Sequence, residues 1–259
     1  MLALNRGDYA EVVMVHMIVL LTDFGESEYV GMMKGVIYSH CPSATVVDLT
    51  HSISPQSVIE AAWVLMHSHR LFPVETVFVC VVDPGVGTSR RAVLVQTSDY
   101  TFLAPDNGLL WPTVSGSRVR LIVDLEVPED AAPTFHGRDV FARAAARLWC
   151  GTEPLALGSQ CESLNKQLHF YLSGRAGQVV RIDRFGNIIT NIPPSGLQSV
   201  KLVVGSKRHS LPFCRTYAEG PDSGLFVTKS SYGTLELTVK NGSANDVLEM
   251  RPGDLLELQ

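Results

Sequence analysis

Two hydrophobic periods alternate along the first half of the chain. Short apolar runs of β type, most of them ended by polar residues, cover 17–22, 45–49, 77–82 and 92–96, and apolar positions at helical spacing cover 29–39, 57–70 and 137–149. Such alternation of strand and helix signals is typical of a largely parallel sheet covered by helices. We therefore predict an α/β domain over residues 17–157.

The pattern changes in the second half. A polar stretch over 158–176 is punctuated by Gly, Ser and Asn, and short alternating segments follow at 179–183, 187–192, 200–204, 224–228 and 233–239, separated by turn residues. This spacing is typical of a small all-β domain. We predict a connector over 158–176 and a β domain over 177–259, and two unlike domains leave a cleft in which ligands commonly bind.

Charge and composition narrow the class of protein. A formal net charge of −5 and a pI near 5.9 over 259 residues argue against a nucleic-acid-binding protein. No apolar run reaches the ~18 residues of a membrane helix. Residues 1–16 carry Arg6, Asp8 and Glu11 without a long apolar core, so we interpret them as an N-terminal extension rather than a signal peptide, and Met17 as an alternative start. Five widely spaced cysteines without metal-ligand spacing indicate buried, reduced thiols in a cytoplasmic protein.

Polar clusters follow several of these apolar runs. Asp23, at the end of the first run, suits a ribose diol or a helix cap, and the sequence alone does not decide between them. Asp83 ends a buried run and is followed by a Pro/Gly turn that returns at Arg90, which suits either a reaction centre or a structural ion pair. His136 precedes a strong helix, whose N-terminus would lower the pKa of the imidazole. Asp139, in the first turn, would complement the helix dipole rather than act in catalysis.

A further cluster lies in the β domain. Asp183 and Asn187 bracket Phe185 across a glycine turn. A carboxylate for an ammonium group, an amide for a carboxylate and a ring for stacking suit an amino-acid ligand, although a plain β-hairpin with an Asp turn explains the same residues.

Taken in order, these clusters resemble the S-adenosylmethionine (SAM) hydroxide adenosyltransferases, or SAM hydrolases, which are relatives of the SAM-dependent fluorinase and chlorinase. The segments that carry the resemblance are 21–25 (LTDFG), 47–53 (VDLTHSI), 83–88 (DPGVGT), 104–108 (APDNG), 135–139 (FHGRD) and 183–187 (DRFGN). The resemblance implies an N-terminal α/β sandwich-like domain, a C-terminal barrel-like β domain, and a homotrimer with sites between subunits. It also implies hydrolysis of SAM to adenosine and L-methionine, with SAM as the substrate and no cofactor or metal.

The resemblance also implies roles for individual residues. The catalytic set corresponds to Asp83, Arg90 and His136. Asp23 would bind the ribose. The methionine part would contact Asp183, Phe185 and Asn187, and the adenine would contact Ser231 and Asn241. The segment 229–233 departs from the family's small-residue run, so the adenine contacts carry over less directly.

The same comparison separates the branches of the family. A fluorinase would have Tyr at position 83, Thr at 86, and Tyr-Ser at 136 and 137, whereas this chain has Asp83, Val86, His136 and Gly137. A carboxylate beside a halide is unfavourable because the two charges are alike. The sequence therefore favours a hydrolase over a halogenase.

We expect Arg90 to keep Asp83 ionised, so that Asp83 orients and deprotonates water with His136 as a second partner. Hydroxide captured by Arg90 is the alternative source of the nucleophile. Two other functions stay open: a sensor that binds SAM or adenosine without turnover, and a metal-dependent hydrolase that uses Asp23, Asp48, His51 and Asp83 as ligands.

Overall fold

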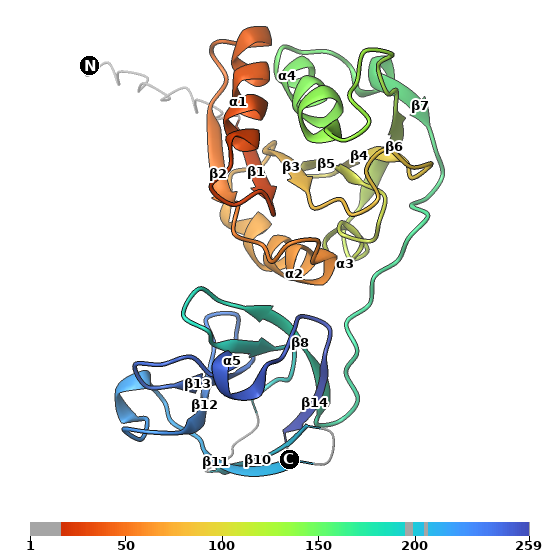
Figure 1. The fold of residues 1–259 in the computed structure, drawn as a ribbon. Coiled ribbons are helices and arrows are strands. Elements are labelled where there is room, and N and C mark those ends of the chain that lie inside the picture. Colours follow the sequence, from red (N-terminus) through yellow and green to blue (C-terminus); the bar gives the residue numbers. More distant parts are fainter. Residues whose placement is uncertain (1–16, 195–198, 205–206, 259) are drawn as a thin grey trace, which may run out of the picture.

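The chain folds into two sheets, one in each half of the sequence, joined by an extended segment (Figure 1). The computed structural model describes residues 17–194, 199–204 and 207–258, so the expected extension 1–16 lies outside the described residues. Residues 161–175 carry neither helix nor strand apart from a single bridge at Ser173. They run between the two halves, as Figure 1 shows.

The N-terminal sheet has seven strands in the order β2-β1-β3-β5-β4-β6-β7. Their bounds are β1 Ile18–Thr22, β2 Val46–Thr50, β3 Val77–Val81, β4 Ala92–Thr97, β5 Thr101–Pro105, β6 Val119–Leu125 and β7 Gly158–Gln160. The neighbours β2, β1, β3 and β5 are parallel, and β4, β6 and β7 each pair antiparallel with the strand before them in this order. Five of the seven strands thus run in one direction, which confirms the prediction of a largely parallel sheet.

Helices cover both faces of this sheet. On one face α1 (Glu28–His40) and α4 (Arg143–Trp149) pack on Ile18, Leu20 and Val79, and on the other α2 (Val58–Ser68) and α3 (Trp111–Val114) pack on Val19, Leu21 and Phe78. Successive residues of β1 therefore enter opposite cores, since side chains alternate along a strand. This two-sided burial explains why residues 18–21 of the strand are all apolar.

Short helical turns complete the elements. They are η1 His69–Leu71, η2 Gly137–Ala142, η3 Pro154–Leu157, η4 Tyr217–Glu219 and the α-helical turn α5 Asn245–Leu248. The sequence predicts one helix over 137–149, but its first part, η2, is π-helical and only the rest is α-helical. π-Helical turns interrupt helices most often at functional sites.

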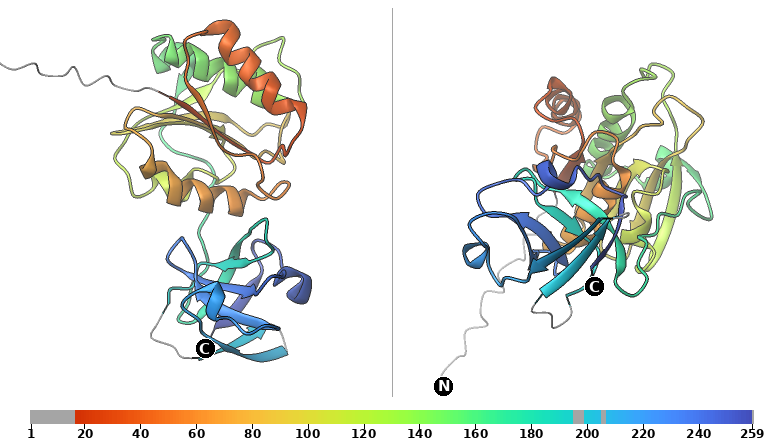
Figure 2. Two further views of the ribbon diagram at one scale, coloured as in Figure 1. Left: turned by 90° about the vertical axis from the view of Figure 1, so that its left-hand side faces the viewer. Right: turned by 60° about the horizontal axis from the view of Figure 1, so that its bottom comes forward.

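The C-terminal sheet is wholly antiparallel, in the order β11-β10-β14-β8-β9-β13-β12. Its strands are β8 Ala176–Ile182, β9 Ile188–Thr190, β10 Ser199–Val204, β11 Lys207–Pro212, β12 Leu225–Lys229, β13 Leu235–Val239 and β14 Leu255–Leu258. The two edges approach each other, because Phe213 bridges Val227 and Cys214 N donates to Val227 O at 2.9 Å. The sheet is thus nearly closed, as expected of a barrel-like unit, and Figure 2 shows it below the α/β half in its left view.

The two halves meet at α2 and β8. Trp63 of α2 is buried with Val180 and Ile189, and Phe170 and Tyr232 pack around them. At the edge of this cluster, Arg181 Nε lies 3.7 Å from Glu60 Oε1. The contact joins residues more than a hundred positions apart, which local sequence patterns do not reveal.

The structure bears on two predictions from composition, which concern the cysteines and membrane-spanning helices. All five cysteines are free thiols, but only Cys41, Cys80 and Cys214 are buried, whereas Cys161 is partly exposed and Cys150 is exposed. Within the described ranges, no helix is both long and apolar enough to cross a bilayer.

Candidate active site

A cleft of about 610 Å³ opens at the carboxyl ends of β1 and β3. Asp23 follows β1 and Asp83 follows β3, and His136 closes the opposite wall, just before η2. Phe24, Tyr29 and Phe135 add aromatic surface, with ring centroids 5.0 to 5.9 Å apart. The ends of neighbouring parallel strands meet at one edge of the sheet, which is where open α/β folds bind ligands.

Arg90 joins the other two residues of the expected catalytic set. Its Nε donates to Asp83 Oδ1 at 3.0 Å, and its Nη2 donates both to Asp83 Oδ2 and, at 2.9 Å, to His136 Nδ1. The Asp83 and Arg90 side chains are only 5% and 10% exposed. A fork of this kind fixes the carboxylate in one orientation.

The contact with Arg90 also defines the protonation of His136. A guanidinium only donates hydrogen bonds, so Nδ1 must accept, and in the neutral ring Nε2 carries the proton. Burial lowers the pKa of His136, and the charge of Arg90 lowers it further, against the opposing pull of Asp83 and Asp139. The direction agrees with the sequence prediction, but burial and Arg90 are the causes, in place of the helix terminus.

Arg90 retains unused donors. Its Nη1 is buried and has no hydrogen-bond partner, while the guanidinium lies over the Phe141 ring at 5.7 Å from the centroid. Buried polar groups are usually satisfied, so among the described residues Nη1 is an unused donor of the Asp83–Arg90–His136 cluster.

The turn between Asp83 and Arg90 depends on one glycine. Gly87 has φ +75°, and a Cβ there would lie 2.4 Å from the Pro133 carbonyl oxygen. The turn therefore packs directly on the segment that leads to His136, which brings Arg90 within reach of that residue.

Asp23 faces the same cleft. Its Oδ2 accepts from Gln56 N at 2.7 Å, which leaves Oδ1 for a ligand. Burial raises the pKa of Asp23, the Gln56 hydrogen bond opposes this, and the nearby Asp83 adds a smaller upward shift. Gln56 adopts a left-handed φ of 64°, and no sequence pattern indicates its role.

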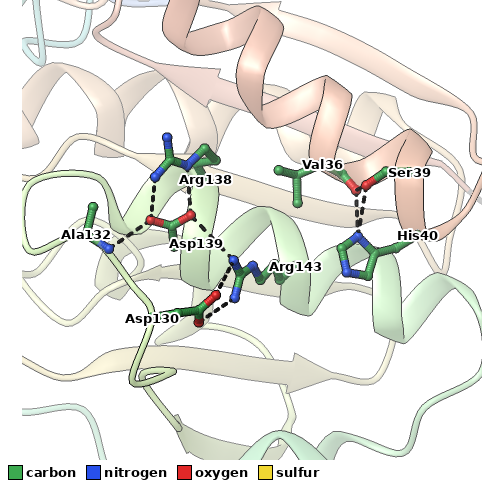
Figure 3. Close-up of polar contacts among 8 residues, drawn as sticks. All are labelled: Val36, Ser39, His40, Asp130, Ala132, Arg138, Asp139 and Arg143. Carbon is green, nitrogen blue, oxygen red and sulfur yellow. Dashed lines mark hydrogen bonds and ion pairs between the residues drawn. The ribbon is translucent and has the colours of Figure 1, made fainter.

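Asp139 lies behind this wall, between two arginines (Figure 3). It accepts from Arg138 Nε at 2.7 Å and from Ala132 N at 2.9 Å, and Arg143 Nη2 lies 3.8 Å away. The bond to Arg138 is the main cause that lowers the pKa of Asp139. The residue was expected to complement a helix dipole; the structure shows it holding the 132–135 segment in place.

A second pocket, of about 680 Å³, lies in the C-terminal half. Asp183, Phe185, Asn187 and Asn241 line it. Asp183 accepts from Phe185 N, Asn187 N and Asn187 Nδ2 at 2.8 to 3.0 Å, so it shapes the turn and keeps little further hydrogen-bonding capacity. Phe185 is 70% exposed at the rim.

Two residues beside this pocket were not expected. Glu236 is buried and accepts from Tyr217 OH at 2.6 Å. Burial raises the pKa of Glu236, the Tyr217 hydrogen bond opposes this, and the charge of Asp183 adds a smaller upward shift. The alternating pattern of the strand that contains Glu236 does not reveal that Tyr217 lies beside it.

The structure does not bring all expected ligand residues together. Ser231 lies in the turn from β12 to β13, whereas Asn241 follows the other end of β13. Only Asn241 lines the pocket with Asp183, so the two expected adenine contacts occupy opposite ends of one strand.

The residues considered as metal ligands are engaged elsewhere. Asp48 pairs with Lys34 at 2.6 Å and with His51 at 3.0 Å, and Asp83 pairs with Arg90. Within the part of the chain that the structure describes, no group of three or more His, Cys, Asp or Glu side chains is arranged to hold a metal ion.

Comparisons with known proteins cover almost the whole chain. Family models described as the SAM hydroxide adenosyltransferase N-terminal domain and C-terminal domain match residues 18–158 and 177–257. An (R)-S-adenosyl-L-methionine hydrolase from Thermus thermophilus is 38% identical over 90% of this chain and 95% of its own length. A fluorinase from Nocardia brasiliensis is 27% identical over 85% of this chain and 89% of its own.

A solved structure shares the fold. The crystal structure of an uncharacterized conserved protein from Thermotoga maritima superposes with a TM-score of 0.84 and 36% identity, covering 94% of this chain and 100% of that one.

Proposed function

This chain belongs to the SAM hydroxide adenosyltransferase family, and on that premise we propose that it hydrolyses SAM to adenosine and L-methionine. The observation that carries the proposal is the fork of Arg90 onto both Asp83 and His136, which line the cleft together with Asp23. The hydrolase relatives are also more similar to this chain than the fluorinase relatives, at 38% against 27% identity.

The reaction is an in-line displacement at C5′. A water or hydroxide oxygen forms a bond to C5′ as the C5′–S bond breaks. The electron pair of the C5′–S bond stays on sulfur, so the sulfonium becomes the neutral thioether of methionine. No metal is needed to stabilise the leaving group, because that group loses its charge as it departs. Catalysis then depends on generating and positioning the nucleophile.

The catalytic set supports these two tasks. Asp83 keeps an acceptor site on each oxygen after the Arg90 contacts, and it takes a proton from water. His136 donates from Nε2–H and thereby orients the same water. Arg90 Nη1, which has no partner among the residues that the structure describes, is proposed to stabilise the oxygen as negative charge develops.

The remaining residues are proposed to bind SAM. Asp23 accepts from the ribose hydroxyls through its free oxygen. Asp183 and Asn187 bind the methionine part, Phe185 offers its exposed ring for stacking, and Asn241 and Ser231 remain proposed adenine contacts.

The division into two pockets supports a site shared between subunits. The cleft at Asp83 and the pocket at Asp183 have no lining residue in common within one chain. Exposed aromatic side chains border both: Tyr29 at the first is 45% exposed, and Phe185 at the second is 70% exposed. We propose a homotrimer in which the 177–259 domain of one subunit closes the cleft of the 17–157 domain of the next. The free cysteines suit a cytoplasmic enzyme.

Product analysis tests the proposal. Purified protein is incubated with SAM after chelation of metals, with and without fluoride or chloride, and products are separated by chromatography. Adenosine and methionine in all samples support a hydrolase. A 5′-halogenated nucleoside would indicate a halogenase, loss of activity on chelation a metal enzyme, and bound but intact SAM a sensor.

A further inference from the structure

Glu60 is a buried carboxylate that the proposed chemistry does not use. Its surface is completely buried, in the first turn of α2. Oε2 accepts from Ser54 N at 3.1 Å, but Oε1 has no hydrogen-bond partner. Burying a carboxylate is unfavourable unless it is paired, so its position here implies a compensating partner.

That partner comes from the other half of the chain. Arg181 of β8 places Nε 3.7 Å from Glu60 Oε1, and its side chain is only 17% exposed. Burial raises the pKa of Glu60, and Ser54 and Arg181 oppose this shift. The pair lies beside the apolar contact of Trp63 with Val180 and Ile189, so charge attraction adds to the docking of β8 on α2.

Glu60 also supports the wall of the cleft. Glu60 accepts a hydrogen bond from Ser54 N, and Ser54 lies two residues before Gln56. Gln56 N in turn donates to Asp23 Oδ2 at 2.7 Å. Gln56 holds a left-handed φ of 64°, which a side-chain-bearing residue adopts only when its surroundings enforce it. Glu60 fixes one end of this short turn, and Asp23 fixes the other.

Arg181 lies next to a turn of the second pocket, as Glu60 lies next to a turn of the cleft. It lies two residues before Asp183, whose carboxylate organises the 183–187 turn. One ion pair thus connects the turn that holds Asp23 to the strand that leads to Asp183.

We propose that Glu60 and Arg181 are paired positioning residues, which hold the 54–56 turn against Asp23 and fix the β8 strand to α2. Neither residue contacts the reacting atoms. The kinetic part of this inference rests on the proposed function, in which Asp23 binds the ribose, whereas the structural part does not.

Hydrogen–deuterium exchange of the ligand-free protein tests the structural part. Glu60→Gln retains the shape and an acceptor for Ser54 but loses the charge, and Arg181→Gln, which is partly exposed, is the milder variant. Both are expected to raise exchange in peptides covering 53–57. Glu162 is an exposed carboxylate that does not line the cleft, so Glu162→Gln is the matched control and should leave exchange unchanged. Unchanged exchange in the two pair variants would overturn the proposal.

A double-mutant cycle on SAM hydrolysis tests the coupling. Each single variant is expected to raise KM roughly threefold to thirtyfold with a smaller change in kcat, and the double variant should resemble a single one because the pair is already lost. Arg181→Lys, which keeps the charge, should restore most of the affinity. Additive effects, or losses confined to kcat, would overturn the proposal. If the wild type forms no adenosine, the proposed function fails, while the exchange experiment still decides the structural role.

Discussion

At the scale of single residues, the proposed mechanism depends on which hydrogen-bond acceptors the Arg90 guanidinium contacts. Nε and Nη2 are engaged by Asp83 and His136, and Nη1 is buried without a partner. Lysine offers one point charge instead of a planar fork, so it cannot hold both residues at once. The three side chains therefore act as one unit, and their individual contributions should not add.

Substitutions at Asp83 and Arg90 test this unit. Asp83→Asn keeps the shape but removes the base, and we expect kcat to fall roughly 10²- to 10⁴-fold with KM little changed. Arg90→Lys should lower kcat by a similar order, and the double variant should be little worse than either alone. Steady-state kinetics measure all three. A kcat for Asp83→Asn near the wild-type value would remove Asp83 as the base.

The pH dependence follows from His136. Its folded-state pKa lies below the ordinary value near 6.5 because of burial and Arg90. The ring is therefore neutral at pH 7, and kcat/KM should stay level as the pH falls towards 6.5 and decline only below the lowered pKa, where protonated Nδ1 can no longer accept from Arg90. His136→Gln should lower the rate and abolish that acid limb. A decline centred above pH 6.5 in the wild type would contradict this protonation state.

At the scale of elements, the turn over 83–90 and the π-helical η2 bring the catalytic residues together. The sequence predicted β1 and β3 and the polar residues at their ends, since fully buried strands are uninterrupted apolar runs. It did not predict β11, whose sequence KRHSLP is polar, nor the π-helical start of the helix after His136. Both depend on tertiary packing, which local periodicity does not encode.

Gly87 provides the test at this scale. Gly87→Ala combines a left-handed φ with a Cβ 2.4 Å from the Pro133 carbonyl oxygen, and we expect it to lower the free energy of unfolding by about 3 kcal/mol. Gly85→Ala is the matched control, because its Cβ would meet nothing closer than 3.5 Å. Urea unfolding compares the two. Equal stability of both variants would show that the turn does not pack as described.

At the scale of the whole molecule, the two pockets remain apart within one chain. The sequence motifs indicated residues of both pockets through their resemblance to one family, which also implies sites between subunits. The motifs did not indicate Gln56, Glu60 or Tyr217, because the roles of these residues arise from contacts between segments distant in sequence. Ser231 and Asn241, expected to act together, lie at opposite ends of β13.

Complementation tests a site shared between subunits. Asp83→Asn disables the cleft, and Asn187→Ala disables the second pocket. Each variant alone should be nearly inactive, whereas co-expressed chains should regain about a quarter of wild-type activity, because random assembly joins one intact half of each kind in that share of sites. The two variants, purified separately and assayed without mixing, are the control. No recovery in verified mixed oligomers would place each complete site within one chain.

Hydrolysis in ¹⁸O-labelled water shows whether water attacks C5′ of SAM. Mass spectrometry of the products follows the label. Attack by water at C5′ puts one labelled oxygen in adenosine and none in methionine. Unlabelled adenosine, label in methionine, or SAM recovered intact would contradict it.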